Sequence, residues 1–348
     1  MKFGCITDVV VNLENHVWGL FPRNGSGRKR TEKLALVMPS YHDGAMGDMF
    51  GGGWGCRRFL LTIMLSMGVG LLRADPITTQ VVETDVAAGT LTLKGQGLPQ
   101  PNGNGTQIVA VGAGDAAIGY TGQTVSGDLH LSGGTWRLDN IWPANAADKA
   151  VMDEVTRRLS YDSVELGRQA YRDVGDEVPN FALYDENGKL VRSNALLGRR
   201  WVLDFIFTRC AQPDMCPAAT AHMALLQQAL KTAKLDDVTL VTITFDPMYD
   251  TPGILRQYAQ TYGLDLANFE LLTGPPEEIT ALMEQFGILT RTVDGVLQHT
   301  AAAIVVSPQG RITYRKDGDF WTVDEMMRRL QPSSATASPA APEPAKAG

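Results

Sequence analysis

The sequence predicts two folded domains of different classes, an all-β domain followed by an α/β domain. Residues 77–143 alternate short apolar-polar runs with Gly, Asn and Asp turns, which is typical of antiparallel strands. Residues 176–330 alternate buried-strand runs with segments of helical length, which is typical of an α/β layer fold. With 348 residues, 44% of them hydrophobic, the chain is long enough to bury two cores.

Residues 1–74 are expected to be a leader rather than part of a folded domain. Two arginines precede a mostly apolar run, residues 59–72, and Ala74 follows as a small residue suited to cleavage. A helix of this run would span about 21 Å, which is short for a hydrocarbon layer of about 30 Å. We therefore expect a cleaved export signal and a periplasmic or other extracytoplasmic location. The protein would be membrane-anchored if the signal is not cleaved.

Residues 75–144 are predicted to form a small all-β domain. Segments such as GTLTLKG and TWRLDNIW have the alternation of half-buried strands. Their length and number suit a barrel of the oligonucleotide-binding (OB) type. No basic stripe or aromatic platform accompanies these segments, and the net charge of the chain is −7, so we expect no nucleic-acid partner. Residues 145–175 are predicted to be a helical connector, because apolar residues recur there at helical spacing.

Residues 176–330 are predicted to alternate strands and helices. The apolar runs RRWVLDFIF, DVTLVTITF and AAAIVVS are typical of interior strands. Helices are expected over PAATAHMALLQQALKTAK, TPGILRQYAQTYG and PEEITALMEQFG. Residues 331–348 are rich in Ala and Pro and cannot form a core, so we expect a disordered tail.

The segment FTRCAQPDMCP, residues 207–217, indicates reactive sulfur. Cys210 and Cys216 have five residues between them, too many for a C-x-x-C redox motif and unusual for a zinc site. The loop leaves a buried strand and leads into a helix with Pro217 at its first position. Cys216 is therefore expected near a helix N-terminus, where the macrodipole favours a thiolate. The two cysteines are interpreted as a redox pair or as part of a metal site, rather than as inert buried thiols.

Several segments, taken in order, resemble the Sco/SenC family, which has a thioredoxin-like fold. DFIFTRCAQPDMCP resembles the copper-site loop of that family, and TITFDPMYDTPGILRQYAQTYG resembles its second signature. LLTGPPEEITALMEQFGI is similar to its next helix, and QHTAAAIVVSPQGRI to its His-bearing strand. The likeness covers residues 176–330. One departure is the loop length: the family pattern is C-x-x-x-C-P, whereas Ala211 and Gln212 make this loop two residues longer.

The resemblance implies a copper-binding chaperone. It assigns Cys210, Cys216 and His299 as the metal ligands, and two thiolates with one imidazole are donors that suit copper. Asp246, in the segment FDP, would orient His299 or the cysteine loop, or serve only as a turn residue. A disulfide between the two cysteines would remove both thiolates, so copper loading and disulfide formation should exclude one another.

The resemblance also implies partners. We expect a copper-receiving subunit of a haem-copper (cytochrome c) oxidase, whose copper centre the protein would help to assemble. A thiol-disulfide reductant is expected to keep the cysteines reduced, and the protein is expected to be a monomer.

The rival interpretation is an enzyme, a thiol-disulfide oxidoreductase or peroxidase that uses Cys210 and Cys216 catalytically. Thioredoxin-like oxidoreductases usually have a proline just before the strand that faces the active cysteines. Here HTAAA precedes that strand, which favours a metallochaperone over an enzyme. Met215 and Met223 are expected to pack rather than to bind metal, and His222 is expected to face solvent.

Overall fold

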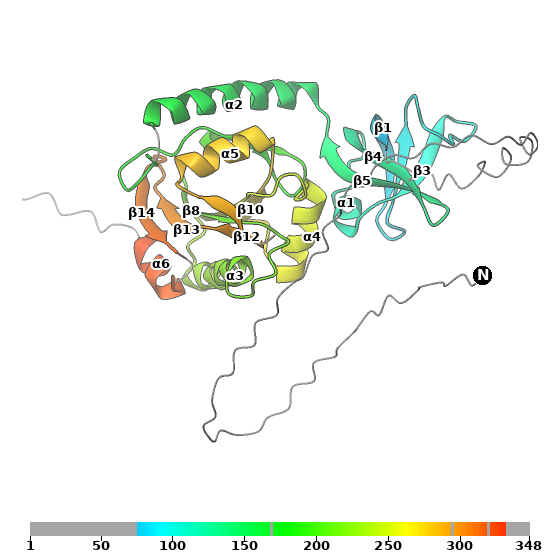
Figure 1. Ribbon diagram of the computed structural model, residues 1–348. Coiled ribbons are helices and arrows are strands. Elements are labelled where there is room, and N and C mark those ends of the chain that lie inside the picture. The colour runs from blue at the N-terminus through cyan, green and yellow to red at the C-terminus, as the bar shows by residue number, and fades with distance from the viewer. Residues whose placement is uncertain (1–74, 168–169, 294–295, 319–320, 332–348) are drawn as a thin grey trace, which may run out of the picture. The chain divides into compact units, whose positions relative to one another are not determined.

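The computed structural model describes residues 75–331, apart from residues 168–169, 294–295 and 319–320. The expected leader and all but the first residue of the expected tail lie outside the described residues. No helix within the described ranges is long and apolar enough to span a membrane. The described chain forms a β-barrel and an α/β domain, and each is presented by itself (Figure 1).

A closed five-stranded barrel forms the first folded part of the chain. It consists of β1 (Asp75–Asp85), β2 (Thr90–Lys94), β3 (Thr106–Ala110), α1 (Ala113–Ile118), β4 (Thr124–Ser132) and β5 (Thr135–Pro143). The spatial order is β1-β2-β3-β5-β4, and neighbouring strands are antiparallel except for the parallel pair β3 and β5. The prediction of a small β-barrel is confirmed.

The barrel interior is filled by alternate residues of its strands. Leu91 and Leu93 of β2 and Val109 of β3 are fully buried. Ile108, between two inward-facing residues of β3, is exposed. This alternation follows from the pleat, which points successive side chains to opposite faces.

The helix α2 (Ala146–Leu166) occupies most of the predicted connector. Asn145 caps it by accepting a hydrogen bond from the amide of Ala147. The helix runs alongside α5 (Pro276–Gln285), as Figure 1 shows. The Thr156 hydroxyl donates to the buried Glu278 carboxylate over 3.0 Å, which ties α2 to α5.

A five-stranded sheet in the order β10-β9-β8-β13-β14 forms the centre of the α/β domain. Its strands are β8 (Arg200–Ile206), β9 (Val238–Thr244), β10 (Phe269–Leu272), β13 (Ala302–Val306) and β14 (Ile312–Asp317). The first three are parallel, and β13 is antiparallel to both β8 and β14. The three buried runs recognised in the sequence are β8, β9 and β13. Every residue of β9 is buried, as expected for an interior strand.

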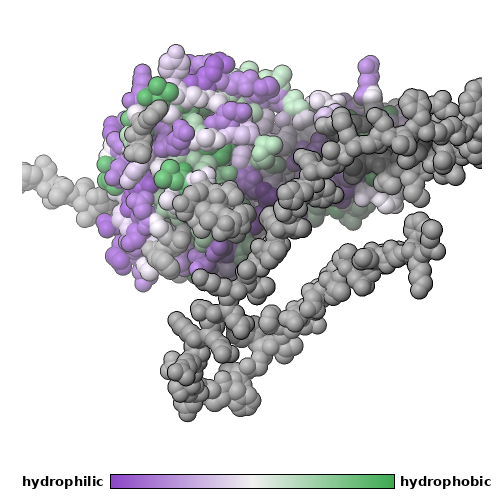
Figure 2. Space-filling view, viewed as in Figure 1, coloured by the Kyte–Doolittle hydropathy of each residue, from purple (hydrophilic) through white to green (hydrophobic). Residues whose placement is uncertain are grey.

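Helices cover the sheet on both faces through two apolar clusters. One cluster joins the sheet to α3 (Cys216–Ala233), α4 (Pro252–Tyr262) and α6 (Val323–Arg329), and the other joins it to α5. Val202 belongs to the first cluster and its neighbour Leu203 to the second, because successive residues of β8 point to opposite faces. Hydrophilic residues dominate the visible surface of this domain in Figure 2.

Two short hairpins complete the domain and were not anticipated from the sequence. One pairs β6 (Ala182–Tyr184) with β7 (Leu190–Arg192), ahead of the 3-10 helix η1 (Ser193–Leu196). The other pairs β11 (Thr290–Val293) with β12 (Val296–His299). The strands β10 and β14 and the helix α6 were also missed.

The carboxyl ends of β8 and β9 place two loops side by side. Ile206 pairs with Thr244 at the end of this parallel register, and the amide of Phe245 donates to the carbonyl of Ile206 over 2.9 Å. The cysteine loop leaves β8 at this edge, and the turn containing Asp246 leaves β9 beside it. The sheet therefore brings the two sequence signatures together.

Candidate metal centre

Cys216 and His299 meet in the folded chain although 83 residues separate them. Cys216 is the first residue of α3 and is only 1% exposed, and His299 is the last residue of β12. The Sγ atom of Cys216 lies 3.4 Å from Nε2 of His299. Two of the three predicted ligands are thus in direct contact.

The surroundings of His299 fix which ring nitrogen faces the sulfur. Its Nδ1 lies 3.1 Å from the carbonyl oxygen of Thr300, so Nδ1 carries the proton and donates it. In the neutral imidazole the lone pair is then on Nε2, the nitrogen that faces Cys216. The rings of Phe207 and Phe245 stand 6.1 Å and 4.6 Å from the imidazole, centroid to centroid, and form apolar walls. A neutral imidazole with this tautomer is the form that binds a metal.

Cys210 lies on the loop before α3 and is half-buried. Its amide donates to the carbonyl of Phe207 over 3.3 Å, and its sulfur lies 3.8 Å from the carbonyl oxygen of Gln212. Both Cys210 and Cys216 are free thiols. Among the described residues, the three candidate donor atoms do not all lie within 4.8 Å of one another. Shared coordination of one ion therefore requires Cys210 and the Cys216–His299 pair to rearrange relative to one another.

The protonation of Cys216 differs from the sequence-based expectation. Burial raises the pKa of this thiol well above its usual range, and the neighbouring Cys210 adds to the effect. The expected macrodipole effect on Cys216 is too small to offset the loss of hydration. The prediction of a favoured thiolate is therefore wrong for the metal-free protein. A coordinating metal ion reverses this balance, since it deprotonates the thiol that binds it.

Asp246 is hydrogen-bonded to the cysteine loop rather than to His299. Its carboxylate accepts hydrogen bonds from Arg209, with Nε at 2.9 Å, and Arg209 also stacks over the ring of Tyr249 at 4.3 Å. Of the roles predicted for Asp246, its hydrogen bonds support both the contact with the cysteine loop and the turn, because its carbonyl accepts from the amides of Tyr249 and Asp250. A second carboxylate of the same turn was missed from the sequence: Asp250 is fully buried and bonded to Thr208.

Three further soft or titratable side chains lie near the cysteine loop in sequence, those of Met215, His222 and Met223. Met223 is fully buried in the apolar cluster under α3, as expected. Met215 is half-buried at the N-terminal cap of α3. His222 was expected to face solvent, but it is half-buried, with its ring 5.4 Å from that of Trp321. The edge-to-face packing on Trp321 explains the difference.

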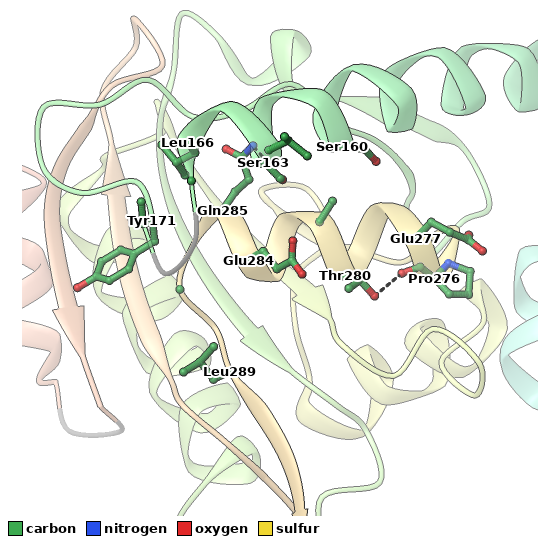
Figure 3. A pocket seen from close by; sticks show the side chains of 15 residues that line it. Ser160, Ser163, Leu166, Tyr171, Pro276, Glu277, Thr280, Glu284, Gln285 and Leu289 are labelled. Atoms are coloured by element: carbon green, nitrogen blue, oxygen red, sulfur yellow. Dashed lines mark hydrogen bonds between the residues drawn. The ribbon is translucent and has the colours of Figure 1, made fainter.

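A groove between α2 and α5 is distinct from this centre. Tyr171, Glu284 and Leu289 are among the residues that line it (Figure 3). None of its lining residues is a candidate metal ligand. The candidate metal ligands Cys210, Cys216 and His299 therefore lie outside this groove.

The comparison with known proteins matches the part of the chain that forms the α/β domain. A sequence model of the family described as SCO1/SenC matches residues 169–332. The SCO1 protein homolog of Bacillus subtilis (strain 168) is 33% identical over 150 residues, which are 42% of this chain and 76% of that protein. This chain belongs to the SCO1/SenC family. The barrel and α2 lie outside the part that matches the family.

Two solved structures of the family are also similar. BsSco, described as having a disulfide switch and as a member of the Sco family of cytochrome c oxidase assembly proteins, is 31% identical, with a TM-score of 0.41 over 46% of this chain and 95% of that chain. ScoI of Bradyrhizobium japonicum with copper bound is 28% identical, with a TM-score of 0.39 over 44% of this chain and 98% of that chain. Family members have thus been crystallised with copper.

Proposed function

We propose that this protein binds copper through Cys210, Cys216 and His299 and acts in the assembly of the copper centre of a cytochrome c oxidase. The observation that carries the proposal is the 3.4 Å approach of the Cys216 sulfur to Nε2 of His299. Copper binding and a role in oxidase assembly are supported by one relative described as a member of a family of cytochrome c oxidase assembly proteins and another crystallised with copper.

The donor set fits copper better than zinc. Two thiolates and one imidazole supply soft and borderline ligands, which suit Cu(I). A structural zinc site is normally closed by four protein ligands. Among the described residues, one group of three carboxylates lies close enough together to hold a cation. It consists of Asp185, Glu186 and Glu270 and includes none of the candidate copper ligands. The cysteine and histidine residues are therefore proposed to hold a single copper ion with low coordination number.

Copper binding should release protons. Cys216 is protonated in the metal-free protein, because its burial raises the pKa of the thiol. Coordination by two thiolates requires both cysteines to lose their protons, so affinity should rise with pH. A rearrangement of Cys210 relative to the Cys216–His299 pair would accompany binding of the ion.

The test is anaerobic titration of the reduced protein with Cu(I) in competition with a chromophoric chelator. We expect tight binding of one ion, weakened at least tenfold by His299→Ala and lost after oxidation of Cys210 and Cys216 to a disulfide. His222→Ala is the matched control, because it removes an imidazole of α3 that packs edge-to-face on Trp321 and is not a candidate ligand. Equal affinities for the two histidine variants would contradict the assignment.

A thiol-disulfide oxidoreductase is the second candidate function. This function is supported by the exposure of the two thiols. Cys210 is partly exposed, as an attacking thiol must be, and Cys216 is buried. In this case Cys210 would attack and Cys216 would resolve the mixed disulfide. Catalytic turnover of a disulfide or peroxide substrate by a protein that binds copper weakly would favour this function.

We also propose that the protein is exported, that a copper-receiving oxidase subunit and a thiol reductant are its partners, and that it is monomeric. The apolar run at residues 59–72 supports export. For the barrel we propose the OB type and a docking role, supported by the strand order β1-β2-β3-β5-β4 with α1 between β3 and β4. Protease protection of the protein in intact cells, lost when the outer envelope is opened, would test its location.

A further inference from the structure

The two residues that precede Cys210 are both bonded to one turn of the neighbouring loop. Thr208 donates its amide to Oδ2 of Asp250 over 3.1 Å and its hydroxyl to Oδ1 of the same carboxylate. Arg209 donates to Asp246, four residues earlier in that turn. The start of the cysteine loop is thus held at two successive positions.

The bond to Asp250 is the buried one of the two. Asp250 is 0% exposed, and Oδ2 also accepts from the hydroxyl of Thr244 over 2.5 Å. Burying a carboxyl group is costly unless hydrogen bonds satisfy it, and here three donors do so. The amide of Asp250 donates to the carbonyl of Asp246 over 2.9 Å, which closes the turn. Asp250 therefore has little freedom to move.

The bond between Arg209 and Asp246 is weaker as an anchor. The Arg209 side chain is 54% exposed, so water and salt screen its attraction to the carboxylate. Most of the restraint on the loop should therefore come through Thr208.

The other two candidate ligands, Cys216 and His299, are held in place by contacts that do not involve Thr208. Cys216 is fixed by the start of α3 and by the apolar cluster in which it is buried. His299 is held by its bond to Thr300, whose amide donates in turn to the carbonyl of Leu289. Cys210 lies in a loop without regular structure, two residues downstream of Thr208, so the chain between them can span at most about 7 Å. The position of Thr208 therefore determines the region that the Cys210 sulfur can reach.

We propose that Asp250, acting through Thr208, is a positioning residue that holds Cys210 within reach of the Cys216–His299 pair. The inference rests on the proposed copper function but names a residue outside the ligand set. The same restraint governs how readily the two sulfurs meet when they form a disulfide. Its loss should therefore weaken copper binding and disulfide formation together, and should leave the Cys216–His299 contact in place.

The test compares Thr208→Val, which keeps the side-chain shape and removes the hydroxyl, with Thr208→Ser, which keeps the hydroxyl. Changes in residues that orient metal ligands typically weaken metal affinity by about 10–100-fold. We expect at least a tenfold loss of Cu(I) affinity for Thr208→Val and near-original affinity for Thr208→Ser. Asp250→Asn should weaken Cu(I) binding more than Thr208→Val does. If Asp250→Asn does not fold, the comparison of Thr208→Val with Thr208→Ser still tests the proposal.

A metal-free readout separates positioning from general destabilisation. Oxidised glutathione converts the Cys210 and Cys216 thiols to a disulfide and is itself reduced to two molecules of glutathione. We expect the equilibrium constant of this exchange to fall about tenfold in Thr208→Val. The control is Thr156→Val, which removes a comparable hydroxyl-to-carboxylate bond between α2 and α5 and should change neither value.

The outcomes distinguish this proposal from the proposed function. Thr208→Val with original copper affinity and an original disulfide equilibrium would overturn the positioning role, whatever its thermal stability. If the unaltered protein bound no copper, the proposed function would fail, and the disulfide equilibrium would still decide the role of Asp250.

Discussion

Asp204 provides the sharpest prediction about stability. It lies within β8 and is 4% exposed. Its Oδ1 accepts a hydrogen bond from the Thr242 hydroxyl over 2.6 Å, and its Oδ2 is buried without a hydrogen-bond partner among the described residues. Burial raises the pKa of this carboxyl from 3.8 to about 7. The folded protein therefore keeps Asp204 protonated at a pH where the unfolded chain has released the proton.

The sign and size of the effect follow from this difference. Well below pH 3.8 the group is protonated in both states, and its stabilising contribution is fully present. As the pH rises toward 7, the unfolded chain binds fewer protons than the folded protein, so the free energy of unfolding falls. A pKa of about 7 against 3.8 corresponds to about 4 kcal/mol in total.

The assay is urea denaturation of the reduced, metal-free protein at several pH values between 4 and 8, beside Asp204→Asn. The amide cannot titrate, so the variant lacks this contribution. Other buried carboxyls with pKa raised to about 7, such as Glu186 and Glu278, act equally in both proteins. The difference in unfolding free energy between the two proteins should change by about 4 kcal/mol across the range. Parallel pH profiles would refute the reasoning.

Two further predictions concern the support of the site. Phe286→Ala should lower the free energy of unfolding by about 3–5 kcal/mol, because the ring is fully buried and its centroid lies 5.6 Å from that of Phe205. Urea denaturation measures this loss, and a loss below about 1 kcal/mol would contradict the packing argument. Thr251→Ala should cost about 1 kcal/mol, since the Thr251 hydroxyl caps α4 by accepting from the amide of Ile254 over 3.4 Å. Its Cu(I) affinity should match that of the unaltered protein, and a tenfold change would show that the cap acts on the site.

The strands that could be predicted were those whose local sequence is decisive. β8, β9 and β13 are runs of apolar and β-branched residues buried almost throughout, and such runs are unusual outside an interior strand. β14 and the β11–β12 hairpin were missed because their short or mixed patterns resemble loops. The position of His299 at the end of β12 was therefore not foreseen, although its role as a candidate ligand was.

The parts of the site that could not be predicted depend on contacts between distant segments. Asp250 stands before Thr251 and Pro252, a local pattern that is explained fully as a helix start, and its partner Thr208 is 42 residues away. The raised pKa of Cys216 likewise depends on its burial by the assembled core, whereas its place at a helix start was evident locally. Local sequence patterns indicate which residues are candidate metal ligands. Contacts between distant segments determine the pKa of Cys216 and how firmly the cysteine loop is held.

The most direct test of the proposed metal centre is X-ray absorption spectroscopy of the Cu(I)-loaded protein, beside His299→Ala. We predict two sulfur ligands from Cys210 and Cys216 and one nitrogen ligand, with the nitrogen contribution lost in the variant. A spectrum with sulfur ligands alone, or a nitrogen contribution that persists in His299→Ala, would contradict the proposed metal centre.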